Sequence, residues 1–430
     1  MDRLARLGVH CPEILLPVDG TDLHRWAVVA CDQYTSQPQY WEQVEKLVGD
    51  AFSSLKLMLS EAYLSAPDVE GRIAAIRRNM TEYLDQGVLE SQGRAMIYTQ
   101  RVFRGRTRHG LVLAVDLERY DYSPQSKSLV RATEATVPDR LPPRVAIRQG
   151  SALEMPHVLL LIDDPQKTVL EPLQRQTGKL PLLYDFELMQ EGGRIQGWKV
   201  KGEAQESRLA DALEGLLVGS DPMLFAVGDG NHSLATAKLC WENLKPTLSA
   251  EEQTTHPARF ALCEVVNLHD PALVFEPIHR VLFGPGPEEC LQSLVALLKK
   301  EGYAPGLVHP PQDAALTGMF GNDHALPVVY QGKRAVLTLS AQNAPLPLSA
   351  LQPAIDAFLD ENPGWAIDYV HGSGAVDELC QDPGRLGILL PVLDKYKLFP
   401  AVGQGGPLQR KSFSLGEAHE KRYYLECKRI

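Results

Sequence analysis

The stretch Phe225-Ala-Val-Gly-Asp-Gly-Asn-His-Ser-Leu234 joins an apolar segment to an amphipathic one and decides the fold class. Met223–Val227 is apolar and strand-like, and a helical repeat follows it from about His232 or Ser233 onward. The apolar members of that repeat are Leu234, Ala237, Trp241 and Leu244. A strand that turns directly into a helix, within a chain that mixes both elements, predicts an α/β (mixed α+β) protein.

Gly228 and Gly230 flank Asp229 in the turn between the predicted strand and helix. Glycine permits a positive φ and a close approach of the backbone to a ligand. The N–H groups of the first helical turn have no partner within the helix, so they favour an anion placed above the turn. Ser233 could add a hydroxyl donor and His232 an imidazole. We therefore expect a phosphate-binding loop here.

A structural interpretation of the same loop stays open. Gly-Asp-Gly is a common turn, and Asn231 or Ser233 near a helix start is a common N-cap. The loop has neither the spacing of a Walker phosphate-binding loop nor the third glycine of a dinucleotide fingerprint. The helix dipole contributes only about 1 kcal/mol toward an anion, so tight phosphate binding would need additional cations.

Strand and helix patterns alternate over the rest of the chain. Met96–Phe103 and Leu111–Leu117 predict a hairpin around a basic turn, and Phe260–Asn267 predicts a buried strand. Polar, proline-containing residues 123–150 predict a long functional loop or linker. Residues 415–426 predict a polar C-terminal helix. We expect three regions: an N-terminal α/β region (1–125), a phosphate-binding core (126–285) and a C-terminal α/β region (286–430).

Composition narrows the possible partners. The 430 residues carry 43 Lys and Arg against 54 Asp and Glu, a formal net charge of -11. An acidic chain is not expected to bind nucleic acid or anionic lipid by charge neutralisation. No apolar run approaches the roughly 18 residues of a membrane helix. We expect a small-molecule partner and neither nucleic acid nor membrane.

The seven cysteines are odd in number, widely spaced and without a C-x-x-C pair. This usage is typical of a reducing compartment, so we expect a cytoplasmic protein. H-E-x-x-H and C-x-x-C spacings are absent too, which argues against a structural transition metal.

Several segments, in order along nearly the whole chain, resemble a mostly bacterial family, domain-of-unknown-function family 1015. The loop with Asp229 and His232 resembles the D-G-H-H-R loop of that family. The other matching segments are Arg131-Ala-Thr-Glu-Ala-Thr136, Asn267-Leu-His-Asp-Pro-Ala-Leu-Val274, Pro277-Ile-His-Arg280 and Lys411-Ser-Phe413. The family is similar to the ParB/sulfiredoxin superfamily, which includes an archaeal ADP-dependent serine kinase. The resemblance implies a ParB/sulfiredoxin-like core and kinase-like chemistry.

The loop departs from the family pattern at two positions, where Asn231 replaces a histidine and Ser233 an arginine. In the sulfiredoxin relatives the position of Asn231 carries the reactive cysteine, so reductase chemistry is not expected. Loss of a phosphate-gripping arginine forfeits a charge-assisted bond of about 1.5–3 kcal/mol. Other cations would have to replace it, and the candidates are Arg131, Arg144, Arg148, Arg280 and Lys411.

The resemblance implies a role for each matching residue. Glu134 would be the catalytic base, and Asp229 and His232 would act on the transferring phosphate, with Asp229 also a Mg²⁺ ligand. The phosphate or nucleotide would be bound by Gly228, Gly230, Asn231, Ser233, Arg131 and Lys411, and the substrate by His279, Arg280 and Ser412. Asp32 and Tyr34 are weaker candidates. Each could instead be structural: a solvated carboxylate, a turn cap or a buried histidine.

These observations predict a phosphotransferase that phosphorylates a small hydroxyl metabolite, with L-serine as the first guess. ATP, ADP or pyrophosphate would be the donor, with Mg²⁺ as cofactor. Two alternatives stay open: a non-enzymatic nucleotide sensor, and a phosphatase acting on a phospho-amino acid.

Overall fold

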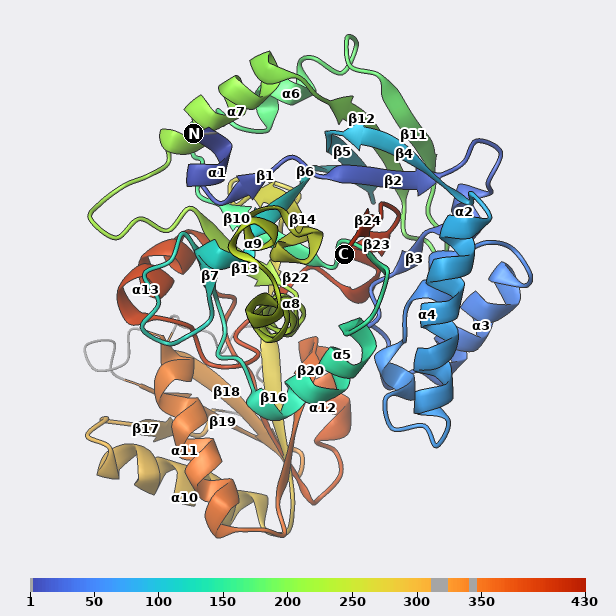
Figure 1. Cartoon of the computed structure of the whole chain (residues 1–430). Coiled ribbons are helices and arrows are strands. Elements are labelled where there is room, and N and C mark those ends of the chain that lie inside the picture. Colours follow the sequence, from blue (N-terminus) through green and yellow to red (C-terminus); the bar gives the residue numbers. More distant parts are fainter. Residues whose placement is uncertain (1–2, 311–323, 340–345) are drawn as a thin grey trace. The chain divides into compact units, whose positions relative to one another are not determined.

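The computed structural model describes residues 3–310, 324–339 and 346–430 (Figure 1). Their contacts divide the chain into two compact units. The first contains residues 1–274, 398–407 and 415–430, and the second contains residues 275–397 and 408–414. The three regions predicted from the sequence, with boundaries near residues 125 and 285, stay a prediction.

A ten-stranded mixed sheet forms the centre of the first unit, in the order β11-β12-β5-β6-β14-β10-β13-β8-β7, with β1 paired to β6. The strands are β1 (Val9–His10), β5 (Met96–Phe103), β6 (Arg106–Asp116), β7 (Tyr120–Asp121), β8 (Val130–Ala132), β10 (Val158–Ile162), β11 (Leu182–Glu187), β12 (Arg194–Val200), β13 (Phe225–Asp229) and β14 (Phe260–Asn267). β10 runs parallel to β14 and antiparallel to β13, while β13 runs parallel to β8. The C-terminal ends of β8 and β13 and the N-terminal end of β10 therefore lie at one edge.

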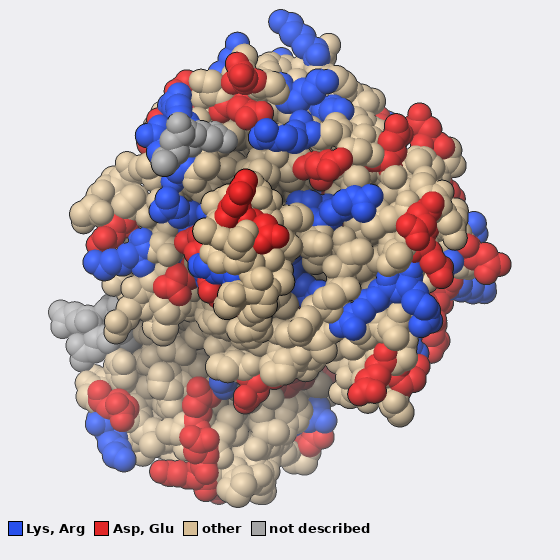
Figure 2. Space-filling model, in the orientation of Figure 1, with Lys and Arg blue, Asp and Glu red and all other residues tan. Residues whose placement is uncertain are grey.

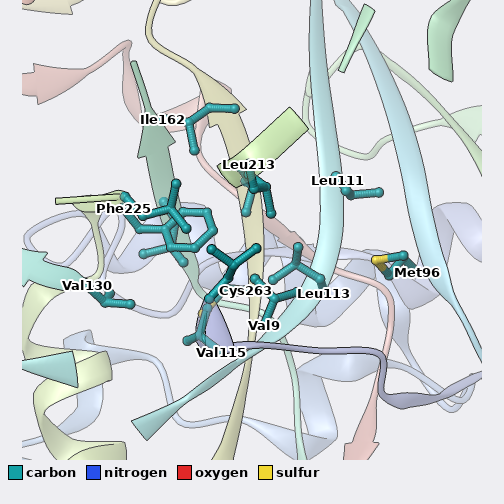
Figure 3. Packing of buried hydrophobic residues seen from close by; sticks show 14 of the residues in the cluster. Val9, Met96, Leu111, Leu113, Val115, Val130, Ile162, Leu213, Phe225 and Cys263 are labelled. Carbon is teal, nitrogen blue, oxygen red and sulfur yellow. The ribbon is translucent and has the colours of Figure 1, made fainter. Parts of the chain in front are cut away.

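Apolar side chains on both faces of this sheet are buried, and the central strands β10 and β14 are near-continuous apolar runs. One face packs against α1 (Arg3–Arg6), α7 (Glu203–Glu214) and α8 (Asn231–Leu244). In Figure 3, Phe225 of β13, Cys263 of β14 and Leu113 of β6 point into this cluster. The other face packs against α3 (Pro38–Val48), α4 (Val69–Asp85) and residues 423–427. The mixed α/β fold predicted from the sequence is confirmed.

Further short elements complete the first unit. They are α2 (Leu23–Trp26), α5 (Leu141–Arg148), α6 (Glu171–Gln174), α9 (Ala250–Thr255), α13 (Leu398–Gly405), β2 (Glu13–Pro17), β3 (Val28–Val29), β4 (Leu89–Arg94), β9 (Leu153–Glu154), β23 (Tyr423–Tyr424) and β24 (Lys428–Arg429). β23 pairs with β3, and β24 pairs with β9. The C-terminal segment is therefore held in the first unit by strand pairing.

Two sequence predictions in the first unit are wrong. Residues 415–426 form no α-helix: Tyr423 and Tyr424 form the short strand β23, which pairs with β3, and Tyr423, Tyr424 and Leu425 are all buried. Residues 123–150 are not one long loop, since they contain β8 and α5. The polar, proline-containing composition concealed a short strand and a helix that begins at Leu141 and carries Pro142 and Pro143 in its first turn.

The predicted hairpin of β5 and β6 is confirmed, with a shorter connection than the sequence suggested. Arg104 and Gly105, with φ of 44° and 76°, form a two-residue turn, and Phe103 pairs with Arg106. Two central residues at positive φ are typical of a type I′ turn. The basic residues after the turn therefore belong to β6 rather than to a loop.

The second unit contains a six-stranded antiparallel sheet in the order β17-β19-β18-β21-β16-β20. Its strands are β16 (Ile278–Phe283), β17 (Gly306–Val308), β18 (Ala325–Tyr330), β19 (Lys333–Thr338), β20 (Ala366–His371) and β21 (Arg385–Ile388). Helices α10 (Pro287–Lys300) and α11 (Pro347–Glu361) share an apolar core with this sheet. The shorter helix α12 (Ser373–Leu379) packs into a second, smaller cluster.

Acidic and basic side chains are intermixed on the face drawn in Figure 2, with broad uncharged areas between them. Within the described residues, no helix combines the length and the apolar character needed to cross a membrane.

Candidate functional site

The loop between β13 and α8 makes a close backbone approach at Gly230, but to another strand of the protein; the predicted approach to a phosphate stays a prediction. Gly230 has a φ of 81° and caps α8, which begins at Asn231, one residue earlier than expected. A Cβ on Gly230 would lie 2.8 Å from His157 Cδ2 and 3.2 Å from Val158 Cα. The approach is therefore to the start of β10, which leaves no room for a side chain at position 230.

Gly228 serves a different purpose from the one predicted. It lies inside β13 and does not adopt a positive φ. A Cβ at this position would be 2.7 Å from Leu161 Cγ and 2.8 Å from Leu415 Cδ1. The expectation that Gly228 supplies unusual backbone freedom is wrong, because packing against two leucines explains the glycine.

Asn231 ties the start of α8 to the end of β8. Its side chain is buried, its Oδ1 accepts from Thr133 N at 3.2 Å, and its Nδ2 donates to Val227 O at 3.5 Å. Thr133 Oγ1 also donates to Val227 O, at 2.5 Å. Because β8 and β13 are parallel, with Ala132 opposite Val227, Glu134 follows at the same edge as the loop.

His232 fixes the segment that follows Glu134. Its Nε2 accepts from Val137 N at 3.2 Å, so the proton of the neutral ring lies on Nδ1. Glu134, His232 and Ser233 are each half-buried at this edge. The structure thus brings the predicted base and the predicted loop to one place, while their catalytic roles stay predictions.

Lys421 is the cation at this loop, and the sequence did not single it out. Its Nζ lies 3.1 Å from Asp229 Oδ2, and the side chain is almost completely buried. Asp229 Oδ1 accepts from Gly230 N at 3.0 Å. Lys421 was overlooked because its segment was expected to be an exposed helix, whereas it is held in the core next to β23.

The three cations that the sequence proposed within this unit are engaged elsewhere. Arg131 is buried and donates to the carbonyl oxygens of Ser128 and Asp221. Arg144 pairs with Glu61, and Arg148 pairs with Glu154. A phosphate-binding role for Arg131 stays a prediction, but two of its donors already have backbone partners.

A half-buried acid–base pair lies beside Gly230. His157 Nε2 is 3.5 Å from Asp32 Oδ2, and His157 Nδ1 is 2.6 Å from the Tyr424 hydroxyl. Burial alone would raise the pKa of Asp32, but the charge and hydrogen bond of His157, the bond from Gln33 and the charge on Lys421 hold it well below its usual value. Asp32 therefore remains ionised at neutral pH.

His157 is shifted in the opposite direction. Burial alone would lower its pKa, but Tyr424 and Asp32 raise it well above the ordinary value. With both ring nitrogens protonated, Nε2 donates toward Asp32 and Nδ1 donates to the Tyr424 oxygen. The Tyr424 hydroxyl can then donate to Cys31 Sγ at 3.2 Å, which completes a chain of four side chains.

Sequence reasoning ranked Asp32 as a weak candidate and missed His157 and Tyr424. The only local signal for His157 was a histidine directly before the apolar run Val158–Ile162. Tyr34, the other weak candidate, stacks on Tyr40 with ring centroids 3.7 Å apart and has φ of 52°.

The remaining predicted residues lie in the second unit. Arg280 is fully buried and donates to Gln352 Oε1 and to the carbonyl oxygens of Ile278, Arg410 and Lys411. Most of its guanidinium therefore holds the backbone that carries Lys411 and Ser412, which leaves little of the fork for a bidentate anion. Ser412 itself donates to Gln409 O.

His279 is also built into the second unit. Its Nδ1 accepts from Leu390 N at 3.0 Å. Burial, together with the charges on His371 and Arg280, lowers the pKa of His279 to about 4, so the ring is neutral at physiological pH. Substrate binding by His279, Arg280 and Ser412, and phosphate binding by Lys411, stay predictions.

The described residues contain no group of three or more His, Cys, Asp or Glu side chains arranged to hold a metal ion. Mg²⁺ is usually bound through one or two carboxylates together with substrate phosphates, and this arrangement needs no such group. Asp229 could supply one oxygen, although its Oδ2 is ion-paired with Lys421.

Comparison with known proteins identifies the family. The sequence profile described as "Protein of unknown function (DUF1015)" matches residues 15–358, and no curated protein sequence matches the chain. Among solved structures, a free serine kinase in complex with AMP is similar at 12% identity and a TM-score of 0.40, over 73% of this chain and 90% of the kinase. A conserved hypothetical protein from Pyrococcus furiosus is similar at 11% identity and a TM-score of 0.38, over 74% of this chain and 94% of its own. Because the profile covers well over half of the sequence, the chain belongs to the family of proteins of unknown function DUF1015.

Proposed function

We propose that this protein is a small-molecule phosphotransferase that moves a phosphoryl group from ATP, ADP or pyrophosphate to a hydroxyl metabolite, with L-serine the first candidate. One observation carries the proposal: a helix N-terminus, the Lys421–Asp229 pair and the ionised Asp32 beside His157 meet at one edge of the sheet. Phosphoryl transfer requires positioning and positive charge on the moving group more than covalent chemistry.

The loop residues have distinct roles in this proposal. The N–H groups at the start of α8 and the Lys421 ammonium receive the phosphoryl oxygens, with Asp229 orienting Lys421 until the donor arrives. The substrate hydroxyl oxygen forms the new bond to phosphorus as the bond to the leaving phosphate oxygen breaks. Glu134, at the end of β8, accepts the hydroxyl proton. Asp229 would be the ligand that this chain offers to Mg²⁺, and the ion would neutralise phosphate charge.

The rest of the assignment rests on family resemblance. The family resemblance supports four further proposals: kinship with ParB/sulfiredoxin proteins, serine as the substrate, a cytoplasmic location, and substrate binding by the second unit. Within the second unit, we propose that Arg280 acts by fixing the backbone at Arg410 and Lys411 rather than by binding the substrate directly.

Replacing Glu134 with Gln is expected to lower phosphoryl transfer by a factor of about 100 or more, because general-base catalysis typically contributes that much. The protein is incubated with L-serine, Mg²⁺ and each donor in turn, and O-phosphoserine is quantified by mass spectrometry. Glu203→Gln, an exposed carboxylate in the first turn of α7, is the matched control. Full activity of Glu134→Gln would refute the assigned base, and no product with any donor would refute the kinase assignment.

Replacing Lys421 with Gln is expected to weaken donor binding roughly tenfold or more, because it removes a charge-assisted bond to phosphate. Calorimetric titration with ADP measures the effect. Lys46→Gln, an exposed lysine on α3, should bind as the unaltered protein does. Equal affinities for the Lys421 and Lys46 variants would remove Lys421 from the donor site.

A nucleotide sensor is the second candidate, and one observation favours it. Asn231 and His232 use their side chains to hold residues 133 and 137, an arrangement that could couple ligand binding to movement of that segment. Calorimetric binding of nucleotide with no product from any hydroxyl substrate would support the sensor. Release of phosphate from O-phosphoserine without a donor would instead support the phosphatase.

A further inference from the structure

Three arginines line a recess on the β5–β6 hairpin, and none of its lining residues belongs to the loop of the proposed function. The recess is open to solvent, and its empty space of about 270 Å³ includes part of that solvent. Its lining residues are Arg101, Phe103, Arg106, Arg108, Ala272 and Glu420. Arg101 and Arg108 occupy directly paired positions on β5 and β6. Like charges placed opposite each other in this way destabilise a sheet unless something neutralises them.

No carboxylate bonds directly to Arg101 among the contacts of the described residues. Arg101 is buried, and its donors go to the carbonyl oxygens of Gly192, His419, Glu420 and Lys421. Burial lowers the pKa of Arg101, and the charge on Arg108 lowers it further. Its charge is therefore solvated by neutral dipoles rather than balanced by an anion.

The nearby carboxylates of Glu264 and Glu420 bind groups other than Arg101. Glu264 is ion-paired with Arg422 at 3.0 Å and accepts from Thr99 Oγ1 at 2.8 Å. The Glu420 carboxylate accepts from Glu417 N at 2.8 Å, which closes a capping box. The recess therefore keeps an excess of positive charge.

Arg108 supplies an independent sign of a missing partner. Its Nη1 donates to Glu420 O at 2.9 Å, but its Nε is buried and has no hydrogen-bond partner within the described part of the chain. A buried N–H of a charged group is costly to leave unbonded. Arg106 adds a third guanidinium from the exposed side.

We propose that this recess is an anion-binding site for a phosphate group, either free phosphate or the phosphate of a small phosphomonoester. The planar fork of arginine suits phosphate oxygens, and Phe103 and Ala272 give the recess apolar walls against which an organic portion can pack. This site is distinct from the loop at Asp229 and does not depend on the proposed function.

Hydrogen bonds connect the recess to the backbone of Lys421. Arg101 donates to the carbonyl oxygen of Lys421 itself, and Arg108 donates to that of Glu420. Lys421 Nζ in turn contacts Asp229. A phosphate bound by Arg106 and Arg108 would therefore lie beside the Arg101 guanidinium, which holds the short segment that presents Lys421 to the loop.

Arginine footprinting tests the proposal residue by residue. The full chain is treated with phenylglyoxal in sodium phosphate, in O-phosphoserine or in sodium chloride of equal ionic strength, and modified peptides are quantified by mass spectrometry. We expect both phosphate compounds to slow modification of Arg106 and Arg108 several-fold while Arg78, exposed on α4, reacts at the same rate in all solutions. Protection by O-phosphoserine at lower concentration than by free phosphate would identify the phosphomonoester as the better ligand.

Equal modification of Arg106 and Arg108 in all three solutions would overturn the proposal. Repeating the experiment with Lys421→Gln separates the two sites, because protection of Arg106 should persist when the loop site is damaged. Arg106→Gln, which changes an exposed side chain, should reduce thermal stabilisation by phosphate, whereas Arg78→Gln should not. If stabilisation is unchanged in Arg106→Gln, Arg106 does not bind the anion.

Discussion

Replacing Arg422 with Met is expected to lower the free energy of unfolding by about 3–5 kcal/mol, which is typical when one member of a buried ion pair is removed. Arg422 is 2% exposed and donates to Glu264 and Glu426, which are 3% and 0% exposed. Tyr184 of β11 donates to Glu426, and Thr99 of β5 donates to Glu264. The methionine would leave two buried carboxylates without their cation.

The stability that Arg422→Met loses should depend on pH, because Arg422 affects the pKa of Glu264. Burial would raise the pKa of Glu264, but Arg422, Arg108, Thr99 and Arg101 together lower it in the folded protein. A lowered pKa contributes stability above the unfolded value of about 4.3 and loses it as pH falls through the folded value. Without Arg422 the folded pKa should instead rise, so the variant is penalised most at neutral pH and least near pH 4.

Urea unfolding at pH 7 and at pH 4.5 measures both effects. Arg194→Met is the matched control, because Arg194 pairs with Asp185 on an exposed strand end and should change stability little. A loss of stability in Arg422→Met no larger than that of Arg194→Met at pH 7 would show that the network contributes nothing.

The elements best predicted from the sequence are those whose signal is local. Phe260–Asn267 was expected as a buried strand and forms β14 over the same residues, because eight mostly apolar residues ended by a polar one leave little choice. The helix after the glycine loop was expected for a similar reason, since Leu234, Ala237 and Trp241 share a buried face. Strand order could not be inferred, because the parallel pairing of β10 with β14 joins segments about a hundred residues apart.

The candidate site was predicted where one continuous motif carries it and, for Glu134, through the family resemblance. The turn around Asp229 and its nearness to Glu134 followed from one motif and its family resemblance. The groups that give the site its charge come from distant segments: Asp32 follows β3, His157 precedes β10, and Lys421 and Tyr424 lie near the C-terminus. Lys421 sits in a stretch whose charged residues predict an exposed helix, and only the packing of Tyr423 and Tyr424 reveals that it is buried.

The second large expected effect is a loss of stability on replacing Gly230, the glycine before α8. Gly230→Ala is expected to destabilise the protein by about 2–5 kcal/mol, about 1–2 from the left-handed backbone and 1–3 from overpacking. The new Cβ would lie 2.8 Å from His157 Cδ2 and 3.2 Å from Val158 Cα, and the backbone of β10 cannot yield as a flexible side chain would. The same methyl group would push His157 away from Asp32, so the pKa of His157 should fall toward its ordinary value.

Gly286→Ala separates the backbone penalty from the contact with β10. Gly286 caps α10 in the same left-handed region, with φ of 72° against 81° for Gly230, and the atom nearest its would-be Cβ is Glu289 Oε2 at 2.7 Å, the end of a flexible side chain. Both variants carry a left-handed backbone penalty, so the contact with β10 is the main difference between them in urea unfolding. NMR titration of His157 and calorimetric titration with ADP should both change in Gly230→Ala alone. Equal stabilities, with His157 still protonated at neutral pH in both variants, would mean that the loop tolerates the methyl group and that the contact between Gly230 and β10 does not position the acid–base pair.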